Sequence, residues 1–256
     1  MSNGSARYMF AGHAIGAAAR FHRLDEAENL NHIVPTLGSC VVPVTGGRTE
    51  CHAGPYRYEV QIPRSRCLFA VERVGAWIEG RGRDDRHETE LSVEVAGIEV
   101  VEKLRIDTVG LHLLAQRTPG ADASISTQGS RIDGMRLGNV TAAITLDDEP
   151  LTQTGTADQF AAWHTRAGRP IERHGEYQRG TIVREIRLSG PQEELQEMTV
   201  EGHTIRWHGF GRIILGEIHV KGHERRVTMV RLAMGSDAGG DGTIGDTQTN
   251  GALPGG

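Results

Sequence analysis

Four histidines and one glutamate fall between residues 203 and 223, in the stretch HTIRWHGFGRIILGEIHVKGH. Imidazole and carboxylate groups bind transition metals, and they also exchange protons near neutral pH. The stretch therefore raises two chemical possibilities, a metal site and an acid–base site. If the protein is an enzyme, we expect His208, Glu217 and His219 to be its catalytic residues.

The strands that must position these side chains are suggested by the residues around KGHE (221–224), which are typical of a hairpin turn. That turn places Glu217 opposite Thr228, and His219 opposite Arg226. Glu217 and Arg226 are then diagonal neighbours on one face, which predicts an ordinary cross-strand ion pair. A structural role for Glu217 thus competes with the catalytic one.

The remaining histidines do not converge without special geometry. His203 and His208 have opposite parity on their strand, so a regular strand points them to opposite faces. A bulge at Gly209 and Gly211 could turn His208 toward Glu217. The acid–base hypothesis depends on that bulge.

Alternation of apolar and polar residues dominates the rest of the chain and is typical of antiparallel strands with one buried face. We expect an all-β fold of mostly antiparallel twisted sheets, arranged as a sandwich, a barrel or a solenoid-like stack. The stretch ADQFAAWHTR (157–166) predicts one short helix, and residues 24–30 could add a further turn or two. The expected strands are YRYEVQI (56–62), HETELSVEV (87–95), VTAAITLD (140–147), and residues 8–21, 40–44, 68–80, 104–115, 181–188, 204–207, 213–220 and 225–234.

The chain divides into one β-rich domain, residues 1–234, and a Gly/Asp-rich C-terminal stretch, residues 235–256. That last stretch has eight glycines in 22 residues and neither Lys nor Arg. Such a composition predicts a flexible, disordered tail.

Composition narrows the classes of function. A formal net charge of −5 leaves no domain-wide basic surface for nucleic acid, and no run approaches 18 apolar residues, so we expect no membrane span. No signal peptide is recognisable, so the chain as written is expected to be cytoplasmic, although export stays open. Cys40, Cys51 and Cys67 are either reduced or partly paired.

The opening strand FAGHAIGAAARF and the pair SVEVAGIEVVEKLRIDTVGLHL and GSRIDGMRLGN resemble bacterial β-rich proteins of the choice-of-anchor P family. The resemblance covers about residues 8–146. It implies a repetitive β architecture, often exported, and brings no catalytic residues with it. This chain departs from that pattern in lacking a recognisable leader and C-terminal anchor.

No nucleophile elbow, phosphate loop or dinucleotide fingerprint is present in the sequence. We therefore expect a non-catalytic β-rich binding or structural protein that self-associates into a homo-oligomer, with a small-molecule ligand possible and no cofactor or metal. The alternative is an enzyme, namely an isomerase, cyclase or hydrolase acting on a small hydrophobic or sugar substrate.

Overall fold

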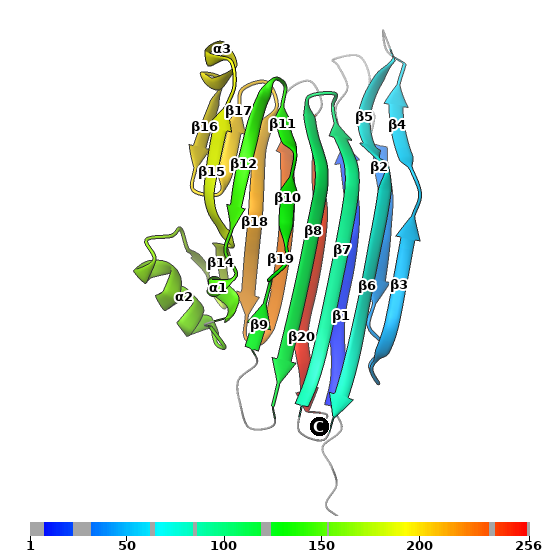
Figure 1. The fold of residues 1–256 in the computed structure, drawn as a ribbon, viewed down its shortest axis with the longest axis vertical. Coiled ribbons are helices and arrows are strands. Elements are labelled where there is room, and N and C mark those ends of the chain that lie inside the picture. Colours follow the sequence, from blue (N-terminus) through cyan, green and yellow to red (C-terminus); the bar gives the residue numbers. More distant parts are fainter. Residues whose placement is uncertain are drawn as a thin grey trace, which may run out of the picture.

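The computed structural model describes residues 8–22, 32–61, 65–83, 86–118, 124–152, 154–235 and 239–254. In this part of the chain, two antiparallel sheets lie face to face with their strands roughly aligned (Figure 1). The expectation of an all-β antiparallel fold is therefore confirmed, and of its three arrangements the structure shows a sandwich.

The first sheet has nine strands among the described residues, in the order β13-β14-β18-β19-β20-β1-β2, with β17 also paired to β18 and β16 to β17. Its strands are β1 (Tyr8–Phe21), β2 (His32–Val41), β13 (Glu172–His174), β14 (Tyr177–Thr181), β16 (Met198–Glu201), β17 (Thr204–Trp207), β18 (Gly211–Lys221), β19 (Glu224–Met234) and β20 (Gly240–Pro254).

The second sheet has eleven described strands, in the order β15-β12-β11-β8-β7-β5-β4, with β9 and β10 paired to β8, β6 to β7, and β3 to β6. Its strands are β3 (Gly47–Ala53), β4 (Tyr56–Val60), β5 (Arg66–Val71), β6 (Arg73–Arg83), β7 (Arg86–Val100), β8 (Leu104–Arg117), β9 (Ser124–Ser126), β10 (Arg131–Asp133), β11 (Met135–Leu137), β12 (Val140–Leu146) and β15 (Val183–Ser189).

The predicted helix is present as α2 (Ala157–Arg166), and its start is explained by a capping box in which Thr156 and Gln159 satisfy each other's backbone N–H groups. Two further helices of four residues each, α1 (Glu149–Thr152) and α3 (Gln192–Leu195), were not predicted. The helices α1 and α2 lie together at the β14 side of the sandwich (Figure 1). The suggested turn at residues 24–30 lies outside the described residues.

The core fills the space between the sheets, where β1 and β20 lie over β6, β7 and β8. Small inward residues on β1, such as Ala14 and Ala17, let the two sheets approach closely. Bulkier residues, such as Val74 on β6, fill the space from the other side. The Gly- and Ala-rich texture of β1 therefore serves close sheet stacking.

The prediction of a disordered C-terminal tail is wrong, and with it the domain boundary at residue 234. Strand β20 occupies the middle of the nine-stranded sheet, hydrogen-bonded to β1 on one side and to β19 on the other. Its glycines are tolerated because the flanking strands supply backbone partners, and Ile244, Thr247 and Thr249 are fully buried. Residues 236–238 and 255–256 lie outside the described part.

A line of single-residue breaks crosses the nine-stranded sheet, and we call it the break row: Gly216 of β18, Met229 of β19, Gly245 of β20, Gly16 of β1 and Gly38 of β2. Pairing stops at each of these residues and resumes beyond it without a change in register. Gly38, Gly216 and Gly245 have φ values of 61°, 54° and 64°, which glycine adopts without steric cost.

The break row reverses which residues face the core. Ile213 and Leu215 point inward before the break in β18, whereas Ile218 and Val220 point inward after it. Ile214 consequently lines a hollow on the outer face. A regular strand would have put Ile214 on the same face as Ile218, since a shift by one residue moves side chains to the opposite face.

Candidate functional site

A cleft of about 360 Å³ opens on the outer face of the nine-stranded sheet, where the β16–β17 hairpin and Pro170 stand beside β14, β18 and β19. Its charged lining consists of four arginines and three glutamates: Arg179, Arg206, Arg212, Arg231, Glu172, Glu201 and Glu217. His203, from the hairpin turn, lines the same cleft. We call this the arginine cleft.

Glu217 lies at the floor of the arginine cleft and is almost fully buried. Arg231 donates to both of its oxygens, from Nε to Oε2 at 2.9 Å and from Nη2 to Oε1 at 2.8 Å. Nε of Arg179 lies 3.2 Å from Oε1, and Nε2 of His219 lies 3.1 Å from Oε2. The carboxylate is thus surrounded by cationic or donor groups on both oxygens.

The protonation state of Glu217 follows from these contacts. Burial by itself would raise the pKa of Glu217, but hydrogen bonds from His219 and Arg231, together with the charge of Arg231, outweigh burial and lower the pKa to about 2. The group is therefore ionised at neutral pH. A carboxylate held in this way is suited to anchoring neighbouring side chains, and poorly suited to exchanging a proton.

The predicted ion pair between Glu217 and Arg226 is wrong, although the hairpin register that suggested it is confirmed. Arg226 instead donates from Nε to Asp246 at 2.9 Å, and Thr228 donates to the same carboxylate at 2.7 Å. Asp246 comes from β20, the segment expected to be a tail. Strand β20 brings this second buried carboxylate beside β19. Arg226 of β19 therefore pairs with Asp246 of β20 and not with Glu217 of β18.

The three residues proposed as catalytic are only partly brought together. His219 and Glu217 are in contact, whereas His208 lies in the turn that joins β17 to β18. Gly209 and Gly211 shape that turn, with φ values of 72° and 127°, and do not form a bulge within the strand. His208 is therefore remote from Glu217, because Glu217 lies six residues, about 20 Å at about 3.3 Å each, along β18 from Gly211.

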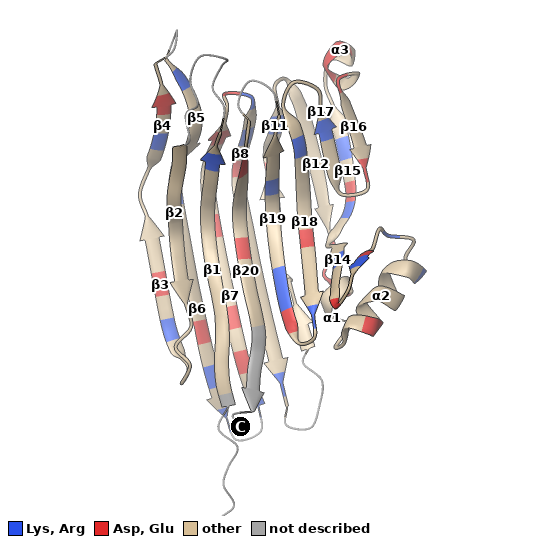
Figure 2. Ribbon diagram, turned by 180° about the vertical axis from the view of Figure 1, so that it is seen from behind, with Lys and Arg blue, Asp and Glu red and all other residues tan. Residues whose placement is uncertain are grey.

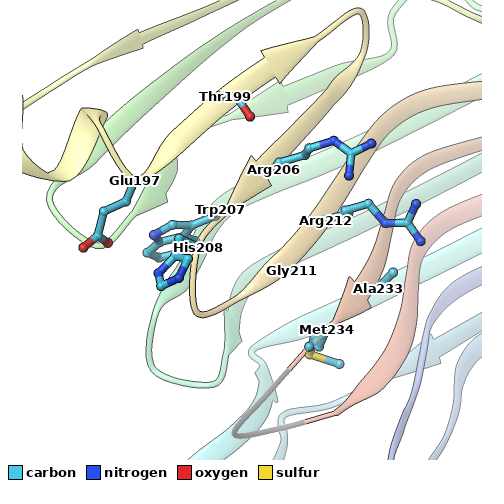
Figure 3. A pocket seen from close by; sticks show the side chains of 10 residues that line it. Glu197, Thr199, Arg206, Trp207, His208, Gly211, Arg212, Ala233 and Met234 are labelled. Carbon is cyan, nitrogen blue, oxygen red and sulfur yellow. The ribbon is translucent and has the colours of Figure 1, made fainter.

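The sequence analysis did not identify the arginines of the cleft. Arg206 of β17 and Arg212 of β18 are directly opposite each other in the sheet. Figure 3 shows their side chains extending from neighbouring strands toward the same side, and both also line an adjoining hollow that includes Trp207 and His208. Arg206 and Arg212 do not belong to any recognisable sequence motif. Only the pairing of β17 with β18 shows that the two arginines are neighbours.

Among the described residues, His203 is the one histidine that lines the cleft. Burial lowers its pKa, although the charge of Glu217 acts in the opposite direction. Its Nδ1 is buried and has no hydrogen-bond partner among the residues that the structure describes. The ring is therefore neutral at pH 7, with one nitrogen unsatisfied.

Metal binding finds no support in the described ranges, where no group of three or more His, Cys, Asp or Glu side chains is arranged to hold an ion. The three cysteines are free thiols. No helix in these ranges is long and apolar enough to cross a membrane.

These features define an all-β sandwich protein with an arginine-lined cleft on the outer face of one sheet. The chain belongs to a family described as "Domain of unknown function (DUF8256)", whose model matches residues 8–187. Neither the curated proteins nor the solved structures contain a match to the chain. The family match does not bear on the choice-of-anchor P resemblance, which stays a prediction.

The family match covers both sheets in part and ends within β15. Most of the arginine cleft lies beyond it, because Arg206, Arg212, Glu217 and Arg231 all follow residue 187. Only Pro170, Glu172 and Arg179 of the lining fall inside the matched residues.

Proposed function

We propose that the protein is a non-catalytic β-rich structural or binding protein that self-associates through the edge strand β2. The observation that carries this proposal is the combination of length, exposure and lack of charge in β2. The strand spans ten residues, contains no Lys, Arg, Asp or Glu, and within the described residues pairs with β1 alone. A long edge strand of this kind is a template for pairing with a second chain.

The other edges of the sandwich differ from β2 in the expected way. Strands β3, β4, β13, β15 and β16 each carry at least one Arg or Glu, and Figure 2 shows charged positions on β3 and β4 beside an uncharged β2. Charged edge residues prevent strands from pairing with another copy. Protection by charge is thus missing at β2. Pro35 lies in a bulge between Val34 and Leu37, so the regularly paired stretches on either side of it are the parts of the edge that could pair with a second chain.

Exposed apolar side chains support the same proposal. Ile33 and Val41 of β2 are 63% and 62% exposed, and Val44, which follows the strand, is 58% exposed. Met9 of β1 lies beside Val44, whose carbonyl accepts a hydrogen bond from the next residue of β1, Phe10. Pairing of two β2 strands would satisfy the free backbone donors and acceptors of the edge and would bring Ile33 and Val41 beside side chains of the partner strand.

Self-association is tested by adding charge to β2. Light scattering coupled to size exclusion is expected to give a multiple of the single-chain mass for the wild type. The double variant Ile33→Lys/Val41→Lys is expected to give a monomer with an unchanged circular dichroism spectrum, because like charges would oppose strand pairing.

The matched control for this experiment is Val200→Lys, an exposed apolar position on β16 that lies away from β2. It should assemble as the wild type does. A wild type that is monodisperse and monomeric at high concentration would overturn the proposal, as would assembly that the β2 double variant leaves intact.

The enzyme alternative is supported by one observation, the contact between His219 and Glu217. A carboxylate that orients a histidine is a common part of acid–base sites. However, Glu217 is committed to Arg231 and Arg179 as well, and His208 is remote. We therefore keep an isomerase, cyclase or hydrolase activity as the second candidate function.

A cytoplasmic location stays part of the proposal. The free thiols of Cys40, Cys51 and Cys67 support a reducing compartment.

A further inference from the structure

An unusual charge arrangement marks the open side of the arginine cleft. Arg206 and Arg212 are cross-strand partners, so their Cβ atoms are about 4.5 to 5.5 Å apart, and like charges in this position repel. Arg206 donates from Nε to Oε2 of Glu201 at 2.7 Å, so Glu201 compensates the charge of Arg206. Arg212 forms no ion pair with any described residue, so one positive charge of the pair is left uncompensated.

The remaining charges of the cleft do not correct this imbalance. Glu217 is engaged by Arg231 and Arg179, and Glu172 lies 3.2 Å from Arg179. With His203 neutral, four arginines face three glutamates, which leaves the cleft with one excess positive charge. This excess stands out in a chain whose formal net charge is −5.

Two buried nitrogens in the same cleft have no hydrogen-bond partner within the described ranges, and His203 can donate from its free nitrogen in the Nδ1–H tautomer. One is the ring of His203 at Nδ1, and the other is Nε of Arg179, which lies near Glu217 without the alignment of a hydrogen bond. Buried polar groups are nearly always satisfied in proteins, by protein atoms, water or a ligand. Unsatisfied nitrogens and an uncompensated arginine in the lining of one cleft therefore favour a ligand that accepts hydrogen bonds and carries negative charge.

The size of the cleft limits that ligand. At about 360 Å³ it lies at the lower end of the range for small-molecule pockets, about 300 to 1,000 Å³. A ligand made of a phosphate or carboxylate group on a small body fits this volume. Guanidinium groups suit these oxyanions because they offer two parallel N–H donors.

We propose that the arginine cleft binds a small oxyanion ligand, bearing a phosphate or a carboxylate group, with Arg212 and Arg206 as its charge partners and His203 as a neutral donor. The proposal goes beyond self-association. The cleft lies at β17 and β18, toward the other edge of the nine-stranded sheet from β2. Ligand binding and self-association can therefore be tested separately, and one proposal can fail without the other.

The test is isothermal titration of the full chain with inorganic phosphate and, separately, with citrate, in sodium chloride that holds the ionic strength constant. Saturable binding of at least one is expected, and the preferred titrant distinguishes a phosphate from a carboxylate ligand. Arg212→Gln is expected to raise the Kd about tenfold or more, because it removes a charge-assisted hydrogen bond. Arg212 is exposed and unpaired, so this variant should fold normally.

The matched control is Arg105→Gln, an exposed arginine on β8 in the other sheet, which should bind as the wild type does. Repeating the titration with Ile33→Lys/Val41→Lys separates ligand binding from self-association, and binding should persist there. The proposal is overturned if neither anion gives saturable heat, or if Arg212→Gln and Arg105→Gln bind alike.

Discussion

Glu217→Gln is expected to lower the free energy of unfolding by about 2 to 3 kcal/mol at pH 7. This is less than the cost of breaking a fully buried ion pair, because the side chains of Arg231 and Arg179 are 37% and 34% exposed and water screens the charges left behind. The glutamine keeps the size of the side chain and removes its charge. Arg231, which donates to both oxygens of Glu217, would then lose its counter-ion, and Arg179 would keep only Glu172. Urea denaturation followed by circular dichroism measures the loss.

The control for this variant is Glu185→Gln. Glu185 is an exposed carboxylate on β15 that pairs with the exposed Arg187, so its removal should change the stability by about 0.5 kcal/mol or less. A loss in Glu217→Gln no larger than that of the control would show that the arginines are solvated independently of the carboxylate, contrary to the structure.

The same carboxylate makes the stability depend on pH in an acid range. The pKa of Glu217 is about 2 in the folded protein and 4.5 in the unfolded chain, so the unfolded chain binds the proton more readily. The stability that Glu217 contributes is complete above pH 4.5 and is lost as the pH falls from 4.5 toward 2. Unfolding titrations across this window should be steeper for the wild type than for Glu217→Gln.

The second large effect is expected for Gly16→Ala, with a loss of about 3 kcal/mol or more, comparable to severe overpacking of a core. Gly16 belongs to the break row and faces the other sheet across the core. A Cβ at this position would lie 2.1 Å from Cγ1 of Val74 and 2.8 Å from the carbonyl oxygen of Leu37. The β-branched Val74 is fully buried and the Leu37 oxygen belongs to the backbone, so neither can move aside cheaply.

Gly54→Ala is the matched control, because a Cβ there meets no atom within 4 Å and its φ is not in the left-handed region. It should leave the melting temperature within a few degrees of the wild type, whereas Gly16→Ala should lower it by about 10 °C or more. Equal behaviour of the two variants would mean that the sheets can separate at Gly16 without loss.

The local part of the fold could be predicted from the sequence because it depends on neighbouring residues. Alternating apolar residues predict β7 and β12, the helix bounds of α2 match those expected, and the KGHE turn aligns β18 with β19 in the register foreseen. Hairpin register follows from the turn itself, and a helix start from the residues beside it. These interactions connect residues close together in the chain.

The candidate site could be predicted only in part. Glu217 and His219 were identified and do touch, whereas Arg179, Arg212 and Arg231 were not. Arg231 reaches Glu217 across the break row, where the inward and outward sides of β18 and β19 exchange. An unbroken alternation gives the wrong side for every residue beyond that point.

The sequence by itself thus determined that this protein is built of antiparallel strands with one main helix, because strand and helix patterns depend on residues close together in the chain. Only the tertiary structure decided that β20 is a central strand, because its backbone partners on β1 are more than 200 residues away in the chain. The tertiary structure likewise decided that Arg226 pairs with Asp246 and that Arg231 pairs with Glu217. Those choices depend on which strands lie side by side, and the composition of a glycine-rich segment does not reveal its neighbours.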